Sequence, residues 1–160
     1  MWSFSITIPF LPPTSNHIYV RTRQGGQTLS SKAIKFRNRF NDEISQVLHE
    51  LQRLPSDRNK SVFVVTFDIF FDTLINATFD GTKKGAKGRY KKIDVTRRVT
   101  FLEDCFAKAI DVDDMFFFGN CSTKHMDPHN PRVEIFIVER SPEEFGIPPL
   151  SPEVAVRLGG

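Results

Sequence analysis

An apolar run of ten residues, VFVVTFDIFF at positions 62–71, constrains the fold more than any other part of the sequence. Valine and phenylalanine favour extended backbone, and a run that is apolar at almost every position indicates a strand buried on both faces. Thr66 and Asp68 interrupt the run, and a bilayer span needs about 20 apolar residues. The sequence therefore predicts a central buried strand and no association with a membrane.

Two amphipathic helices are expected, one on each side of this run. The first follows Ser30 or Ser31, either of which can cap a helix, and it ends at Pro55. The second extends from about residue 94 to residue 109, where Asp94 would complement the helix dipole. Apolar residues recur at helical spacing on one face of each helix: Phe40, Ile44, Val47, Leu48 and Leu51 in the first, and Val95, Val99, Leu102, Phe106 and Ala109 in the second.

Shorter patterns predict strands at 4–8, 115–121 and 132–138, and a hairpin in which 17–22 and 27–29 flank Gly25-Gly26. This order predicts one α/β (α+β) domain over residues 1–140, with a mixed sheet and two main helices. Residues 141–160 hold four prolines and are expected to form a C-terminal extension. The two cysteines form no CxxC motif, which favours a reduced, cytoplasmic protein, and Cys105 is expected in the core.

The positive charge of the chain is concentrated in one segment. Residues 83–98 hold eight basic residues and one acid, Asp94, whereas the rest of the chain holds 14 basic and 18 acidic residues. Such a segment suits a polyanion such as nucleic acid, and a solvated loop is the alternative. The basic residues are Lys83, Lys84, Lys87, Arg89, Lys91, Lys92, Arg97 and Arg98.

Carboxylates flank the second predicted helix, with Asp94 at its start and Asp113-Asp114 just beyond its end. Carboxylates from two elements, with cations beside them, are what metal-assisted hydrolysis of a phosphodiester requires. A helix of about 16 residues is about 24 Å long, so these acids share a site only if the helix is broken or the chain folds back after Ile110. The alternatives are a helix cap at Asp94 and a turn at Asp113-Asp114.

Several segments carry a resemblance to a known family. The most specific is Pro12-Pro13-Thr14-Ser15-Asn16-His17-Ile18-Tyr19, within SITIPFLPPTSNHIYVRT; GGQTLSSKA, the basic loop and the Asp94 helix with Asp113-Asp114 follow in order. Over residues 3–138 the chain resembles the RusA Holliday junction resolvases. The resemblance implies a dimeric RusA-like fold and an endodeoxyribonuclease that resolves four-way DNA junctions. It also implies Mg²⁺ or Mn²⁺ as cofactor and a bacterial or phage-encoded protein.

The central motif of that family is D-[LV]-D-N-x-x-K, and two alignments are possible. In the preferred one, Asp94 matches the first Asp, Thr96 the second, Arg97 the Asn and Thr100 the Lys, and Asp104 matches an Asp farther along the helix. In the other, Lys92 and Asp94 match the two Asp residues and Arg98 matches the Lys. Either alignment lacks one of the three carboxylates expected at the metal.

The resemblance implies roles for individual residues. Asp94, Asp113, Asp114 and Thr96 would hold the metal, and Arg98 would join the three acids in catalysis by offsetting the developing charge. Asn16, Tyr19 and Arg21 would contact DNA together with the basic residues from Lys83 to Arg97. Because the motif is altered, a degenerate homologue that binds branched DNA without cutting it is the second hypothesis. A protein that reuses the fold as an inhibitor or assembly factor is the third.

Overall fold

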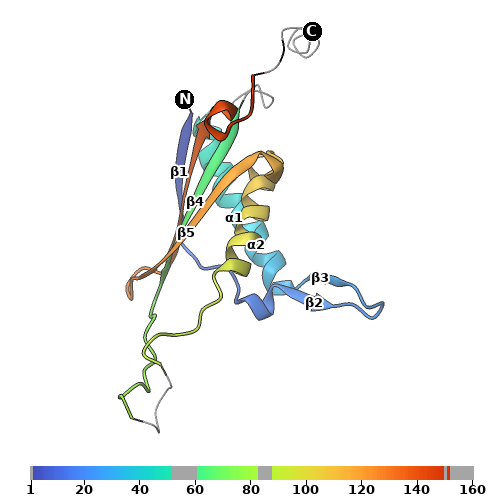
Figure 1. Ribbon diagram of the computed structural model, residues 1–160. Helices are drawn as coiled ribbons and strands as arrows, with labels where there is room; N and C mark the ends of the chain where they lie inside the picture. The colour runs from blue at the N-terminus through green and yellow to red at the C-terminus, as the bar shows by residue number, and fades with distance from the viewer. Residues whose placement is uncertain (1, 52–60, 83–87, 150, 152–160) are drawn as a thin grey trace.

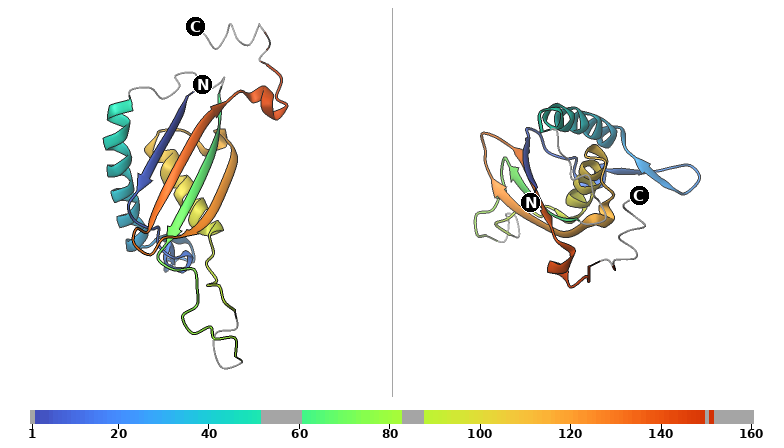
Figure 2. Two further views of the ribbon diagram at one scale, coloured as in Figure 1. Left: turned by 90° about the vertical axis from the view of Figure 1, so that its left-hand side faces the viewer. Right: turned by 90° about the horizontal axis from the view of Figure 1, so that it is seen from above.

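A four-stranded mixed sheet forms one layer of the protein, and two helices form the other (Figures 1 and 2). The computed structural model describes residues 2–51, 61–82, 88–149 and 151. The strands of the sheet lie in the order β1-β6-β4-β5. Their bounds are β1 Ser3–Ile8, β4 Val62–Phe71, β5 Phe117–Met126 and β6 Arg132–Arg140. The predicted mixed sheet, α+β class and central strand at 62–71 are therefore confirmed.

The pairing within the sheet fixes the path of the chain. β6 is antiparallel to both β1 and β4, whereas β4 and β5 are parallel. Parallel neighbours need a crossover connection, and here it consists of an extended segment followed by α2 (Thr96–Ala109). The segment before α2 therefore lies at the end of the sheet where β4 finishes. The segment after α2 lies at the opposite end, where β4 and β5 both begin (Figure 1).

Helices α1 (Ser31–Leu51) and α2 pack on the same face of the sheet (Figure 2). The predicted apolar stripes provide this contact, because Phe40 and Ile44 of α1 and Leu102 and Phe106 of α2 are all fully buried. From the sheet, the core receives alternate residues of β1, β4 and β6. These are Phe4, Ile6 and Ile8 of β1, Phe63, Val65, Phe67, Ile69 and Phe71 of β4, and Val133, Ile135 and Ile137 of β6.

The strand after α2 differs from its expected form. The sequence predicted a strand at 115–121, in which the run Phe116-Phe117-Phe118 favours burial on both faces. Instead, β5 spans Phe117–Met126, and Phe118 is 40% exposed. The physical reason is that β5 lies at the edge of the sheet and no described helix covers the opposite sheet face. The two inner strands are β6 and β4, and in β4 every residue is buried or partly buried, as expected of a central strand.

Two segments project from the end of the molecule where α2 begins (Figure 1). One is the predicted hairpin, formed by β2 (Tyr19–Arg21) and β3 (Gln27–Leu29). The other is the segment between β4 and α2, which we call the basic arm (residues 72–95). Its base is closed by a bridge between Ile75 and Tyr90. Lys83, Lys84 and Lys87 of the predicted basic loop lie outside the described residues.

The part of the C-terminal extension that the structure describes includes the 3₁₀ helix η3 (Pro142–Phe145). The side chain of Glu144 accepts a hydrogen bond from the backbone N–H of Ser141 at its start. Two other 3₁₀ turns, η1 (Ser15–His17) and η2 (Asp114–Phe116), precede β2 and β5. Across the described ranges, no helix is long and apolar enough to cross a membrane.

Candidate nucleic-acid interface

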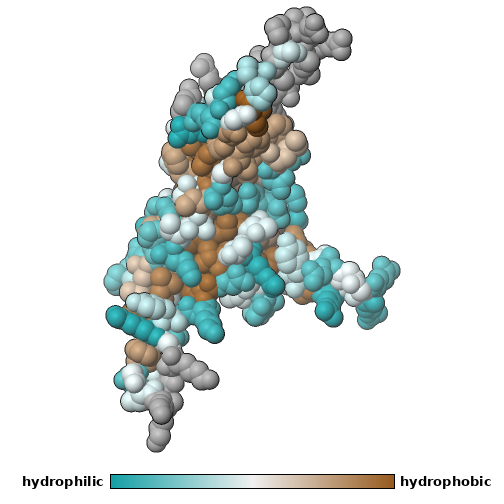
Figure 3. All heavy atoms as spheres, viewed as in Figure 1, coloured by the Kyte–Doolittle hydropathy of each residue, from teal (hydrophilic) through white to brown (hydrophobic). Residues whose placement is uncertain are grey.

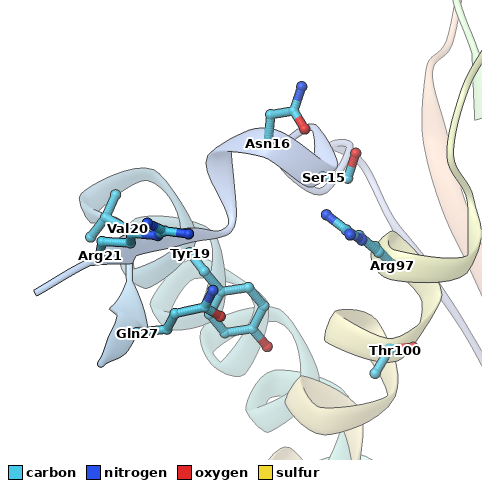
Figure 4. Close-up of a pocket in the computed structure, with 8 residues that line it drawn as sticks. All are labelled: Ser15, Asn16, Tyr19, Val20, Arg21, Gln27, Arg97 and Thr100. Atoms are coloured by element: carbon cyan, nitrogen blue, oxygen red, sulfur yellow. The ribbon is translucent and has the colours of Figure 1, made fainter. Parts of the chain in front are cut away.

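A pocket of about 490 Å³ lies between η1, the β2–β3 hairpin and the first turns of α2. Four of the predicted DNA-contacting residues line it, namely Asn16, Tyr19, Arg21 and Arg97, although about 75 residues separate Arg21 from Arg97 in the sequence. Figure 4 shows Arg21 and Arg97 extending toward one another from β2 and α2, with the Tyr19 ring between and below them. Tertiary packing therefore brings the two sequence signals together.

Local contacts fix η1 and the hairpin against the start of α1. The Ser30 backbone N–H donates to the Ile18 carbonyl at 2.8 Å, and the Ser30 hydroxyl donates to the His17 carbonyl. Ile18 is fully buried in the core. Thr14 Oγ1 and His17 Nδ1 lie 2.9 Å apart across η1. The Pro-rich loop is thus held in place, and Tyr19 and Arg21 emerge from a fixed base.

Asp94 interacts with the first turn of α2. Its Oδ1 accepts a hydrogen bond from the Arg97 backbone N–H at 3.3 Å, and its Oδ2 lies 3.8 Å from Arg97 Nε. Both side chains are exposed, so this ion pair contributes little to stability. The geometry is that of a capping carboxylate, which was the simpler alternative for Asp94.

The basic arm is ordered at its base by Asn76. The side-chain amide of Asn76 donates to the carbonyls of Gly88 and Tyr90, at 2.6 and 3.0 Å. The guanidinium of Arg89 lies 5.7 Å from the centre of the Tyr90 ring. Arg89 and Lys92 are exposed, and Lys91 is partly buried. These predicted DNA contacts therefore lie on the same end of the molecule as the pocket.

The carboxylates expected to share a metal ion fall into two groups at the two ends of α2. Asp94 precedes the helix, whereas Asp113 and Asp114 follow it and lead into β5. With 14 residues, α2 is about 21 Å long, and the chain after Ile110 continues into a strand parallel to β4 instead of returning. In a parallel crossover these two segments lie at opposite ends of the sheet, so the expected fold-back is not formed (Figure 1).

The electrostatic neighbours of these acids agree with the separation. The charge of Asp94 acts on Arg98 in the first turn of α2, whereas that of Asp114 acts on Glu103 and Asp104 in its second half. No cluster of three or more His, Cys, Asp or Glu residues among the described positions could hold a metal ion. The residues present therefore do not fit a Mg²⁺ or Mn²⁺ ion shared by Asp94 and Asp114.

Asp113 and Thr96 make only local contacts. Asp113 Oδ1 accepts a hydrogen bond from the Met115 backbone N–H at 3.0 Å, which caps η2. Thr96 is exposed at the first residue of α2, and its carbonyl accepts a hydrogen bond from Thr100 Oγ1 at 3.0 Å. Asp113 therefore acts as a turn residue, the simpler alternative for the acidic pair.

Arg98 does not occupy the position expected of a catalytic cation. The residue is only 8% exposed, and its guanidinium carbon lies 5.3 Å from the centre of the Phe71 ring. Burial lowers the pKa of Arg98, and the nearby charge of Asp94 opposes this effect. Its Nε has no hydrogen-bond partner in the described part of the chain. Arg98 lies on the buried face of α2, whereas Arg97, one residue earlier, lies on the face that lines the pocket.

A different acidic group lies beside the second half of α2. Burial, with a smaller contribution from the charge of Asp114, raises the pKa of Glu103. Burial also raises the pKa of Asp104, and the nearby Lys108 opposes that shift. Asn120 donates a hydrogen bond to Glu103 Oε2 at 2.8 Å. Asp104 also lines a smaller pocket together with Tyr19, so part of this negative charge lies close to the candidate interface.

Sequence reasoning missed three polar residues that line the pocket: Ser15, Gln27 and Thr100. Ser15 lies inside the Pro-Pro-Thr-Ser-Asn motif and Gln27 inside GGQTLSSKA, so both were in segments that carried the family resemblance. Thr100 lies one turn after Thr96 on α2. Helical periodicity places Thr100 on the face of Arg97, and this signal could have identified it.

The chain matches no protein-family model and no curated protein sequence. The resemblance to the RusA resolvases therefore depends on the motifs alone.

Proposed function

We propose that the protein binds branched DNA on a RusA-like fold without cutting it. The observation that carries the proposal is the convergence of Asn16, Tyr19 and Arg21 with Arg97 around one pocket. Cationic side chains beside aromatic and amide groups suit the phosphate backbone and bases of nucleic acid.

The distribution of charge around the pocket supports the same function. Arg21 and Arg23 of the hairpin, Arg97 of α2, and Arg89, Lys91 and Lys92 of the basic arm belong to elements gathered at one end of the molecule. Figure 3 shows a mainly hydrophilic surface over the hairpin and the start of α2. Cationic groups on several projecting elements can contact separate strands of a branched molecule, and each phosphate contact makes binding more sensitive to salt.

The proposal omits hydrolysis because the conserved chemistry of metal-assisted cleavage requires carboxylates that converge on one ion. Asp94 is engaged with Arg97 at the start of α2, and Asp114 lies beyond the far end of that helix. A homodimer, which the resemblance implies, remains part of the proposal: a two-fold axis would present two copies of the basic end to the paired arms of a junction. Sedimentation with and without the junction would measure the number of copies bound.

The test is binding and cleavage of a synthetic four-way junction, compared with linear duplex of the same length. We expect tighter binding to the junction, a steep fall in affinity with rising salt, and intact strands in Mg²⁺, in Mn²⁺ and in EDTA. The double variant Asp94→Asn with Asp114→Asn should retain binding or strengthen it, because Asp94→Asn removes negative charge at the end of the molecule that binds phosphate. Salt-independent binding, or equal affinity for both DNAs, would contradict the proposal.

Metal-dependent cutting is the outcome that would favour a junction-resolving endonuclease instead. Strand cleavage in Mg²⁺ that EDTA abolishes, and that the double variant also abolishes, would mean that DNA brings Asp94 and Asp114 together. The variant Asp42→Asn, at an exposed position of α1, removes a carboxylate elsewhere and is the control for a general effect of charge.

A further inference from the structure

The pocket beside α2 contains groups that a bound phosphate alone would not need. A phosphate only accepts hydrogen bonds, whereas the side-chain amides of Asn16 and Gln27 both donate and accept them. The pocket also contains the aromatic ring of Tyr19, whose residue is 45% exposed. A matching ligand therefore combines negative charge, a flat ring and a polar edge with both donors and acceptors.

Three of the polar side chains that line the pocket are free to bind such a ligand. Within the described ranges, the side chains of Asn16, Arg21 and Gln27 make no hydrogen bond or ion pair. The nearest charged partner of Arg97 is Asp94, at 3.8 Å and without hydrogen-bond geometry between their side chains. These donors are held on ordered elements, so they can bind a ligand without a large rearrangement of the backbone.

We propose that this pocket holds a single unpaired nucleotide of a DNA strand. Its phosphate lies between Arg21 and Arg97, and its base stacks on Tyr19 with Gln27 at the polar edge. Figure 4 shows Gln27 and Tyr19 side by side beneath the two arginines, and Asn16 at the rim with its amide turned outward. The volume of about 490 Å³ falls within the range of about 300–1,000 Å³ for small-ligand pockets. The inference rests on the proposed DNA-binding function and specifies its substrate.

The consequence is selectivity for DNA that has a base outside the stack. A base in a continuous duplex is paired and covered by its neighbours, so it can enter the pocket only after unpairing and unstacking. A bulged base, or a base at the centre of a junction, avoids much of this cost. Stacking of a base on an aromatic side chain tolerates any sequence, so the selectivity should depend on unpairing more than on base identity.

The test compares three labelled duplexes by fluorescence anisotropy: one fully paired, one with a single bulged nucleotide, and one with the same bulge lacking its base. The base-free bulge has the same number of phosphates and lacks only the base. We expect the full chain to bind the normal bulge at least about tenfold tighter than the base-free bulge. Tyr19→Leu should reduce this ratio to near one while retaining salt-dependent binding to all three duplexes.

The chain contains two tyrosines, and the other provides a matched control. Tyr90 is 69% exposed on the basic arm, outside the pocket, so Tyr90→Leu should leave the ratio unchanged. Arg21→Ala should weaken binding to the normal bulge more than Arg23→Ala does, although both remove one charge from the hairpin.

Equal affinity for the two bulges, or an unchanged ratio in Tyr19→Leu, would overturn the pocket assignment and leave the proposed function intact. Failure to bind the four-way junction as well as all three duplexes would overturn both.

Discussion

Arg98 and Arg97 are adjacent in the sequence and have opposite surroundings. Arg97 is exposed and faces the pocket, whereas Arg98 packs its side chain against Phe71 inside the protein. A buried guanidinium with an unpartnered Nε loses solvation that the folded state does not replace. Its aliphatic stem, in contrast, contributes apolar contact area.

Replacement of Arg98 should separate these two contributions. We expect Arg98→Met to keep the unfolding free energy or raise it by about 1 kcal/mol, because the apolar volume remains and the buried charge is removed. Arg98→Ala should lower it by about 1–2 kcal/mol, because the volume is lost as well. Urea unfolding of both variants measures the difference. If Arg98→Met were as destabilising as Arg98→Ala, the guanidinium itself would be stabilising the fold.

Glu103 should make stability depend on pH. Burial raises the pKa of Glu103 in the folded protein, so the stabilisation associated with its protonated form is present below the unfolded-state pKa and is lost as pH rises through the folded pKa. Glu103→Gln, which still accepts from Asn120, should therefore raise the unfolding free energy at neutral pH by about a few tenths of a kcal/mol, because the site is partly solvated. The gain should vanish below about pH 4. Thermal unfolding of both proteins across pH measures this gain in stability. A gain that persists in acid would contradict the raised pKa of Glu103 as its cause.

Elements of this protein are stabilised by contacts at their ends as well as by their buried faces. Ser30 illustrates the point at α1: its hydroxyl donates to the His17 carbonyl and accepts from the Ala33 backbone N–H, the latter at 3.1 Å. The same residue therefore caps the helix and anchors the loop that carries η1.

Removal of this hydroxyl should weaken both contacts. We expect Ser30→Ala to lower the unfolding free energy by about 1–2 kcal/mol, because a helix cap is lost and the partly buried carbonyl of His17 loses its donor. The next residue, Ser31, is exposed in the first turn of α1, and Ser31→Ala should have almost no effect. Denaturant unfolding of the two variants provides the comparison. Equal effects would mean that the Ser30 hydroxyl is not the main cap of α1.

The whole molecule is electrically asymmetric along α2. Arg97 and the basic arm lie at its start, whereas Glu103, Asp104 and Asp114 lie beside its second half. A polyanion should therefore approach the end that carries the pocket.

This asymmetry can be tested with two substitutions on one helix. Arg97→Gln and Lys108→Gln each remove one positive charge, from the start and the end of α2. We expect Arg97→Gln to reduce the slope of log affinity against log salt by about 0.9, as loss of one phosphate contact does. Lys108→Gln should reduce the slope less, because Lys108, although near Tyr19, lies beside the carboxylate of Asp104. The measurement is a salt titration of DNA binding, and equal reductions would indicate that net charge, not position, controls affinity.

The helices and strands could be predicted from the sequence, because the patterns that specify them are local. Residues 62–71 form the predicted strand, the two apolar stripes form α1 and α2, and Gly25-Gly26 lies in the predicted hairpin. Ser30 caps α1 as expected, and Cys105 is buried, where burial raises the pKa of its thiol to about 12. Each of these features depends on residues a few positions apart, whose spacing is visible in the sequence.

Which residues lie together could not be predicted in this way, because it depends on packing between distant parts of the chain. Parallel pairing of β5 with β4 places Asp94 and Asp114 at opposite ends of the sheet, and it is set by contacts between strands that are distant in sequence. The same long-range packing brings Arg97 to Tyr19 and Arg21. It also places β5 at an edge, so its apolar start remains partly exposed. Local patterns identify strands and helices, but the direction in which neighbouring strands pair depends on the path of the whole chain.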